Sequence, residues 1–212
     1  MRISGLKLLV LLFLCMPTMA GAEGSQKILV LGDSLSAGYG LELGESWVDL
    51  LQNRLNDQGY EFTLVNASIS GDTSSGGLAR LPKALERHQP ALVIVELGGN
   101  DGLRGFPLKV LRRNLSEIIT KARAAGAQVA LLGMRIPENY GARYASGFHA
   151  SYGELAREHE LAFVDFFMDG VALDRSLMQA DGIHPNAKAQ TRLLENAWPA
   201  ICASLTEISC EQ

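Results

Sequence analysis

The chain has 212 residues, of which 47% are hydrophobic and 20% are charged. This composition is that of an ordinary soluble domain and excludes disordered and fibrous proteins. The formal net charge is −4, and the basic residues are scattered, with Arg112 and Arg113 as the only adjacent pair. The chain therefore lacks the basic stripe that nucleic-acid binding requires, and we expect no nucleic-acid partner.

The N-terminal segment has the pattern of a signal peptide. Basic residues precede the apolar run 8–14, and small residues follow at 20–22, which favours cleavage after residue 22. The run is too short to span a bilayer, which takes ~20 apolar residues; a retained membrane anchor is the alternative. The sequence predicts a signal peptide over 1–22, a single mature domain over 23–212, and a periplasmic or secreted protein without stable membrane insertion.

Continuous apolar runs typical of buried β-strands recur along the mature chain. They lie at 28–31, 62–66, 92–97, 129–133 and 162–166. Runs without polar alternation are expected when both faces of a parallel sheet are covered.

Stretches with helical periodicity separate and follow these runs. They lie at 47–55, from near Pro82, at 111–122, at 148–155 and at 193–201, the last with an expected kink at Pro199. The alternation of strands and helices predicts an α/β fold, a three-layer α/β/α sandwich around a mostly parallel five-stranded sheet.

Polar, glycine-containing segments follow the predicted strands. They are 32–36, 66–72, 98–101 and, ahead of the last helix, 181–185. In a sheet of this kind the ligand site lies beyond the carboxyl ends of the strands. We therefore expect these segments to converge on one site.

Ser34 is the candidate nucleophile of this site. It follows a buried strand and is predicted to lie at a helix N-terminus, where N–H groups point outward; the alternative is a plain N-cap. His184 is the candidate base, and Asp181, three residues earlier, can orient its imidazole. An Asp-x-x-His pair also occurs in metal sites, but no further His or carboxylate cluster stands nearby in the sequence, so we expect no metal.

Gly71 and Asn100 are candidate oxyanion-hole residues. Acyl transfer needs donors aimed at the developing oxyanion, and backbone N–H groups with a side-chain amide supply them. Each has a structural alternative, because Gly71 suits a turn with positive φ and Asn100 suits a turn after two glycines. Asp33 is expected to order the nucleophile loop, and Glu96, within an apolar run, to be a hydrogen-bonded structural carboxylate.

The sequence resembles the SGNH (GDSL) hydrolase family in four blocks that come in the family's order. They are Gly-Asp-Ser-Leu at 32–35, Gly71, Gly-Gly-Asn-Asp at 98–101 and Asp-Gly-Ile-His-Pro at 181–185, with further stretches at 66–73, 95–106 and 137–141 similar to the family's bacterial periplasmic thioesterases. The resemblance covers essentially the whole mature chain. It implies a flavodoxin-like sheet, Ser34 as nucleophile, His184 as base and Asp181 as its orienter. It further implies an oxyanion hole of the Ser34 and Gly71 N–H groups with the Asn100 amide, and no metal or organic cofactor.

The resemblance also implies the reaction, a hydrolysis of small-molecule acyl esters, thioesters and lysophospholipids by a serine hydrolase. We expect the protein to be a monomer. Thioesterase, lysophospholipase and arylesterase activities are all expected. Acyl-CoA is confined to the cytoplasm, so lysophospholipids and other periplasmic acyl esters are more available to an exported enzyme. Two alternatives remain open: a carbohydrate-ester deacetylase of the same fold, and a non-catalytic secreted lipid-binding protein.

The segment Leu103-Arg104-Gly105-Phe106 is a candidate lid over the acyl chain. Its glycine allows movement, and its apolar side chains can cover an acyl tail. The resemblance points the same way, because the corresponding thioesterase loop closes over bound acyl groups. The alternative is an ordinary strand-to-helix connection with Pro107 opening the helix.

Cys202 and Cys210 are the cysteines that remain after removal of the signal peptide. Disulfides persist outside the cytoplasm, so we expect the two to pair and to hold the C-terminal tail against the last helix. The closed loop is short, which limits the stabilisation to ~2–3 kcal/mol. Two free thiols are the alternative.

Overall fold

The computed structural model describes residues 25–208. The predicted signal peptide over 1–22 and Cys210 lie outside the described residues. Cys202 is disulfide-bonded, and its pairing with Cys210 stays a prediction.

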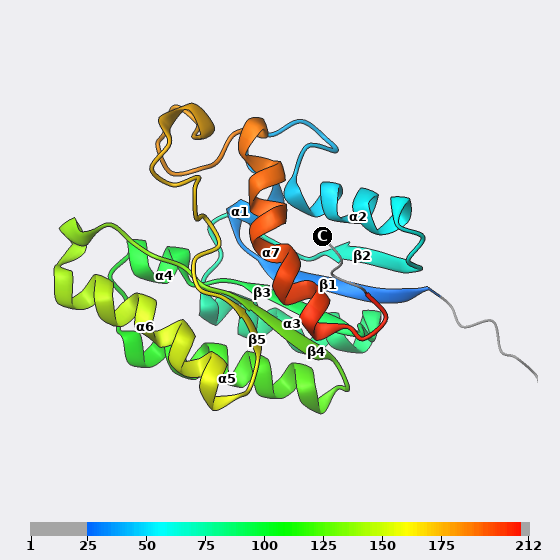
Figure 1. Cartoon of the computed structure of the whole chain (residues 1–212). Helices are drawn as coiled ribbons and strands as arrows, with labels where there is room; N and C mark the ends of the chain where they lie inside the picture. The colour runs from blue at the N-terminus through cyan, green and yellow to red at the C-terminus, as the bar shows by residue number, and fades with distance from the viewer. Residues whose placement is uncertain (1–24, 209–212) are drawn as a thin grey trace, which may run out of the picture.

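The described residues fold around a sheet of five parallel strands (Figure 1). The strands are β1 (Gln26–Gly32), β2 (Phe62–Asn66), β3 (Leu92–Glu96), β4 (Gln128–Leu132) and β5 (Ala162–Val164). Their spatial order is β2-β1-β3-β4-β5, which is the flavodoxin-like order with its topological switch point between β1 and β3. This confirms the predicted fold class.

Helices cover both faces of the sheet and complete three layers (Figure 1). The long helices are α2 (Trp47–Asp57) and α7 (Gln190–Ser204) on one face and α3 (Ser74–His88), α5 (Leu108–Ala124) and α6 (Ala142–Glu158) on the other; the short elements are α1 (Ser34–Ala37), α4 (Gly99–Leu103), η1 (Glu138–Tyr140), η2 (Arg175–Leu177) and η3 (Ala187–Ala189). Because both faces are covered, every residue of β3 is buried.

Helix α3 corrects the expectation of a helix that starts near Pro82. The helix begins eight residues earlier, where the Thr73 side chain accepts a hydrogen bond from the Gly76 N–H, and Pro82 lies inside it. A proline in a helix interior removes a backbone hydrogen bond. Burial of the helix outweighs that cost, since Leu81 is fully buried. Gly77 allows α3 to lie close to Leu97, because a Cβ at position 77 would lie 2.2 Å from Leu97 Cδ1.

An aromatic contact beneath the first short helix supports the carboxyl edge of the sheet. Trp47 and Phe167 are fully buried, and their rings meet edge to face with centroids 5.4 Å apart. The Trp47 Nε1–H donates to Ser36 Oγ at 3.2 Å, which attaches α2 to α1. The helix that carries Ser34 therefore rests on the core.

Within residues 25–208, we find no helix with the length and hydropathy needed to cross a bilayer.

Candidate active site

The polar segments predicted to converge do so at the carboxyl edge of the sheet. Ser34 follows β1 and Asn100 follows β3, so the two lie on either side of the switch point. Gly71 follows β2, and the Asp181–His184 segment follows β5. Because all the strands are parallel, these connections lie at the same end of the sheet.

Ser34 is the first residue of helix α1 and lies within hydrogen-bond reach of a base. The N-cap of α1 is Asp33, whose side chain accepts from the Leu35 N–H, so Ser34 itself is not the cap. The Ser34 hydroxyl is instead 2.9 Å from Nε2 of His184. A hydroxyl in contact with an unblocked imidazole nitrogen can lose its proton as it attacks.

Asp181 fixes the orientation of the His184 ring. Its Oδ2 lies 2.6 Å from His184 Nδ1, and its Oδ1 accepts from the backbone N–H groups of Ile183 and His184 at 2.9 and 3.0 Å. These bonds, led by that from the His184 backbone, lower the pKa of Asp181 to about 2. An ionised Asp181 accepts the Nδ1–H, which leaves Nε2 to take the proton of Ser34.

Tyr39 and Gln179, which the sequence analysis did not identify, also contact His184. The Tyr39 ring packs against the imidazole with a centroid separation of 4.4 Å. The Gln179 N–H donates to the His184 carbonyl at 2.7 Å, and the Gln179 side chain donates to the Tyr39 carbonyl at 2.7 Å. The catalytic loop is therefore tied to the loop that follows α1.

The two other candidate oxyanion donors lie after neighbouring strands, Gly71 after β2 and Asn100 after β3. Gly71 has φ of +78°, a conformation that glycine adopts without strain; this fits the turn alternative, and its role as an oxyanion donor stays a prediction. Asn100 Nδ2 donates to Asp33 Oδ2 at 3.0 Å. An amide nitrogen carries two hydrogens, so this bond leaves the second hydrogen of Asn100 available to another acceptor.

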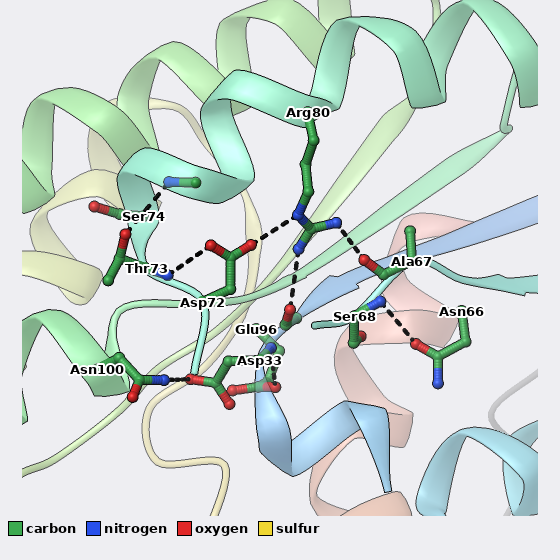
Figure 2. Close-up of polar contacts among 12 residues, drawn as sticks. Asp33, Asn66, Ala67, Ser68, Asp72, Thr73, Ser74, Arg80, Glu96 and Asn100 are labelled. Atoms are coloured by element: carbon green, nitrogen blue, oxygen red, sulfur yellow. Dashed lines mark hydrogen bonds and ion pairs between the residues drawn. The ribbon is translucent and has the colours of Figure 1, made fainter. Parts of the chain in front are cut away.

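An ion pair fastens the Gly71 connection to the end of β1. Figure 2 shows Arg80 of α3 between Asp72 and two backbone carbonyls. Arg80 Nε lies 2.7 Å from Asp72 Oδ2, and its terminal nitrogens donate to the carbonyls of Ala67 and Gly32. One guanidinium thus joins the loop after β2 to the strand that leads to the nucleophile.

Two buried carboxyl groups, those of Asp33 and Glu96, lie close together where β1 leads into α1 (Figure 2). Glu96 Oε2 accepts from Ser36 Oγ at 2.7 Å and from the Asp33 N–H at 3.3 Å, which confirms the predicted hydrogen-bonded carboxylate. Burial, followed by the negative charge of Asp33, raises the pKa of Glu96 well above its usual range. This shift favours the neutral form of Glu96.

A largely apolar cavity of about 290 Å³ opens beside Ser34. Its lining includes the apolar residues Leu35, Leu103, Met134, Ile136, Phe166, Met168, Met178 and Ile183, and also Arg135. Of the candidate lid residues, Leu103 lines the cavity, whereas Phe106 does not and is 39% exposed. An apolar cavity next to a serine nucleophile suits an acyl chain.

The sequence reasoning missed most of this lining. Met134 and Ile136 follow β4, and Phe166 and Met168 follow β5, so they lie at the carboxyl edge that the sequence had identified. Their positions just after strands were the feature of the sequence that could have identified them as lining residues. Being apolar, they could not be told from core residues by composition. In the described part of the chain, no three His, Cys, Asp or Glu side chains group as metal ligands do.

A serine, histidine and aspartate in hydrogen-bonded series, placed beside an apolar cavity at a switch point, define a serine hydrolase site. The model of the GDSL-like lipase/acylhydrolase family matches residues 30–192. The chain belongs to this family.

Curated relatives span most of the chain. Esterase TesA of Pseudomonas aeruginosa is 55% identical over 84% of this chain and 88% of its own length. An arylesterase of Vibrio mimicus is 45% identical over 88% and 92%. Thioesterase 1/protease 1/lysophospholipase L1 of Escherichia coli K12 is 48% identical over 84% of each.

Solved structures agree with the fold. The crystal structure of TesA has a TM-score of 0.83 at 55% identity and covers 85% of this chain and 100% of that one. The psychrotrophic esterase EstA from Pseudoalteromonas sp., inhibited by monoethylphosphonate, has a TM-score of 0.81 at 43% identity and covers 86% and 100%.

Proposed function

We propose that this chain is a serine acyl hydrolase that cleaves small-molecule esters and thioesters through an acyl-enzyme on Ser34. The observation that carries the proposal is the contact of 2.9 Å between Ser34 Oγ and His184 Nε2. Asp181 supports it by holding the opposite ring nitrogen. The family membership and the esterase, arylesterase and thioesterase relatives point to the same reaction class.

Acylation begins when the Ser34 oxygen attacks the carbonyl carbon of the substrate. The hydroxyl proton passes to His184 Nε2, while Asp181 stabilises the imidazolium that results. The negative charge that develops on the carbonyl oxygen is stabilised by the N–H groups of Ser34 and Gly71 and by the Asn100 amide. His184 then gives its proton to the departing alcohol or thiol, and the acyl group stays on Ser34.

Deacylation repeats these steps with water. His184 takes a proton from a water molecule, and the resulting oxygen nucleophile attacks the acyl carbon. The second tetrahedral intermediate has the same oxyanion donors. Its collapse breaks the bond to Ser34 Oγ, returns the proton from His184 to that oxygen and releases a carboxylic acid.

The apolar cavity supports longer acyl chains as substrates. Most of its lining side chains are methionine, leucine, isoleucine and phenylalanine. The predicted signal peptide over 1–22 supports a periplasmic or secreted location, where lysophospholipids and other acyl esters are available and acyl-CoA is not. Lysophospholipase, thioesterase and arylesterase activities are all expected of one site.

The segment after α4 is proposed to cover the acyl chain. Leu103 faces the cavity, and Arg104 Nη2 donates to the Gly71 carbonyl at 3.0 Å. Gly105 has φ of +65°, and the Tyr144 hydroxyl donates to the Phe106 carbonyl at 2.6 Å. These two hydrogen bonds anchor the segment over the site, and exchange of the exposed Arg104 bond with water would let it open.

Two measurements on the mature protein test the proposal. A fluorophosphonate probe should label Ser34, whereas a lipid-binding protein without turnover would stay unlabelled. Rates on aryl esters from acetyl to long acyl chains should rise with chain length. A preference for acetyl over every longer group would favour the carbohydrate-ester deacetylase and contradict the proposed role of the cavity.

A further inference from the structure

We propose that Asp33 is a positioning residue for the oxyanion hole, because its carboxylate holds the Asn100 amide and the start of the nucleophile helix in one fixed arrangement. The inference rests on the proposed function and goes beyond it by giving a task to a side chain that contacts no reacting atom. Asp33 lies immediately before Ser34 and is 2% exposed.

The geometry joins two neighbouring strand ends through one carboxylate. Oδ1 of Asp33 accepts from the Leu35 N–H at 3.1 Å and so caps helix α1. Oδ2 accepts from Asn100 Nδ2 at 3.0 Å (Figure 2). Ser34 and Asn100 supply two of the three proposed oxyanion donors, and they follow β1 and β3, which pair directly. Their relative position is therefore set through Asp33.

The charge of Asp33 selects one orientation of the amide. An ionised carboxylate only accepts hydrogen bonds, so it favours the Nδ2 end of Asn100 and repels the Oδ1 end. The amide is planar, and a bond from one hydrogen fixes the direction of the other. Asn100 and Ser34 line the same cavity, where that second hydrogen can meet the oxyanion. Without the charge, the amide is free to turn its oxygen toward the same site.

The groups that face Asp33 leave it ionised near neutral pH. Burial raises the pKa of Asp33 to about 6, while the hydrogen bonds from Leu35 and Asn100 and the charge of His184 oppose that rise. Burial also raises the pKa of Glu96 of β3 well above its usual range, which favours the neutral form of this neighbour of Asp33.

Two further ionisable groups face Asp33, those of Asp72 and Tyr152. Asp72, in the connection before α3, raises the pKa of Asp33, but it is paired with Arg80 of α3 at 2.7 Å. Tyr152 of α6 is buried, which raises its pKa well above the usual range and keeps it neutral. With a pKa of about 6, Asp33 is therefore mainly ionised at pH 7.

A double-mutant cycle tests this role. Asp33→Asn removes the charge, while asparagine remains a good N-cap for α1. We expect kcat on an aryl ester to fall by roughly 10- to 100-fold with KM little changed, a smaller loss than the ~10²–10³-fold expected of Asn100→Ala, which deletes the donor. In the Asn100→Ala background, Asp33→Asn should change kcat by less than about threefold, because no amide is left to orient.

Asp101→Asn is the matched control. Asp101 is also a buried carboxyl group, it adjoins Asn100 in the chain, and it holds the N–H and hydroxyl of Ser74 at 2.8 and 2.6 Å. Its effect on kcat should be small and equal in both backgrounds. A fall caused by Asp33→Asn that is equally large with and without the Asn100 amide would overturn the proposal.

The pH profile gives a second readout that a purely structural role would not move. Below about pH 6 Asp33 takes up a proton, whereas an asparagine at this position does not titrate. The ratio of kcat/KM between the wild type and Asp33→Asn should therefore shrink as the pH falls through about 6. A ratio that stays the same across this range would overturn the role of the charge. Fluorophosphonate labelling separates the two proposals, since a wild type that is not labelled refutes the proposed function itself.

Discussion

Replacement of Leu103 by serine should compress the preference for long acyl chains. Leu103 lines the cavity beside Ser34 and packs on the core. If its side chain covers two to three methylene groups, at ~0.8 kcal/mol each, the loss is about 2 kcal/mol. That energy corresponds to a roughly 30-fold smaller ratio of kcat/KM between a dodecanoyl and a butyryl ester.

The assay compares kcat/KM for a series of aryl esters in the wild type and Leu103→Ser. Phe106→Ser is the matched control, because Phe106 belongs to the same segment but lies outside the cavity lining and is 39% exposed. We expect the control to retain the wild-type preference. If Leu103→Ser slowed short and long esters equally, the segment would be a plain strand-to-helix connection and the reasoning would fail.

Three further predictions concern the relay, the buried carboxyl group and the cysteines. Asp181→Asn should lower kcat by roughly 10⁴-fold, measured with an aryl ester, because the imidazole loses the partner that fixes its tautomer. The pKa of Asp33 rises from 3.8 to about 6 on folding, so its stabilising contribution is complete below pH 3.8 and is lost as pH rises through 6. Denaturant titration should therefore show the stability of the wild type relative to Asp33→Asn falling by ~3 kcal/mol between about pH 4 and pH 7; a difference independent of pH would contradict the shift. A thiol reagent should find no free thiol at Cys202 or Cys210 in the unfolded, unreduced mature protein, and two reactive thiols there would disprove their pairing.

The layout of the sheet could be predicted because its three central strands, β1, β3 and β4, are largely buried. Apolar stretches marked these strands and the two edge strands, and parallel pairing brought the polar segments after them to one edge. Ser34, Asp181 and His184 could be predicted as partners from their residue types and spacing, and the structure brings them into contact. The family resemblance of the sequence blocks agreed with the same residues.

Contacts that depend on tertiary packing could not be predicted from the sequence. The start of α3 was missed because Gly76, Gly77 and Pro82 disfavour a helix locally, and only the burial of the helix against the sheet explains why it forms. The bond from Asn100 to Asp33 joins residues 67 positions apart, and it follows from the register of β1 with β3 rather than from any motif.

Tertiary structure also explains why Leu103 lines the cavity and Phe106 does not. Both are large apolar residues in one short segment, and the sequence treats them alike. The end of α4 at Leu103 turns that side chain toward the cavity, while Phe106 follows the Gly105 turn and remains partly exposed.

The central claim is that an acyl group is carried on Ser34, and intact-protein mass spectrometry tests it most directly. The mature enzyme is mixed with an aryl ester and quenched in acid during turnover. We predict a mass increase of one acyl group that maps to the peptide containing Ser34, and no increase or turnover in Ser34→Ala, whose kcat should fall by at least ~10³-fold. Near-normal turnover in Ser34→Ala, or acylation at another residue, would contradict the account.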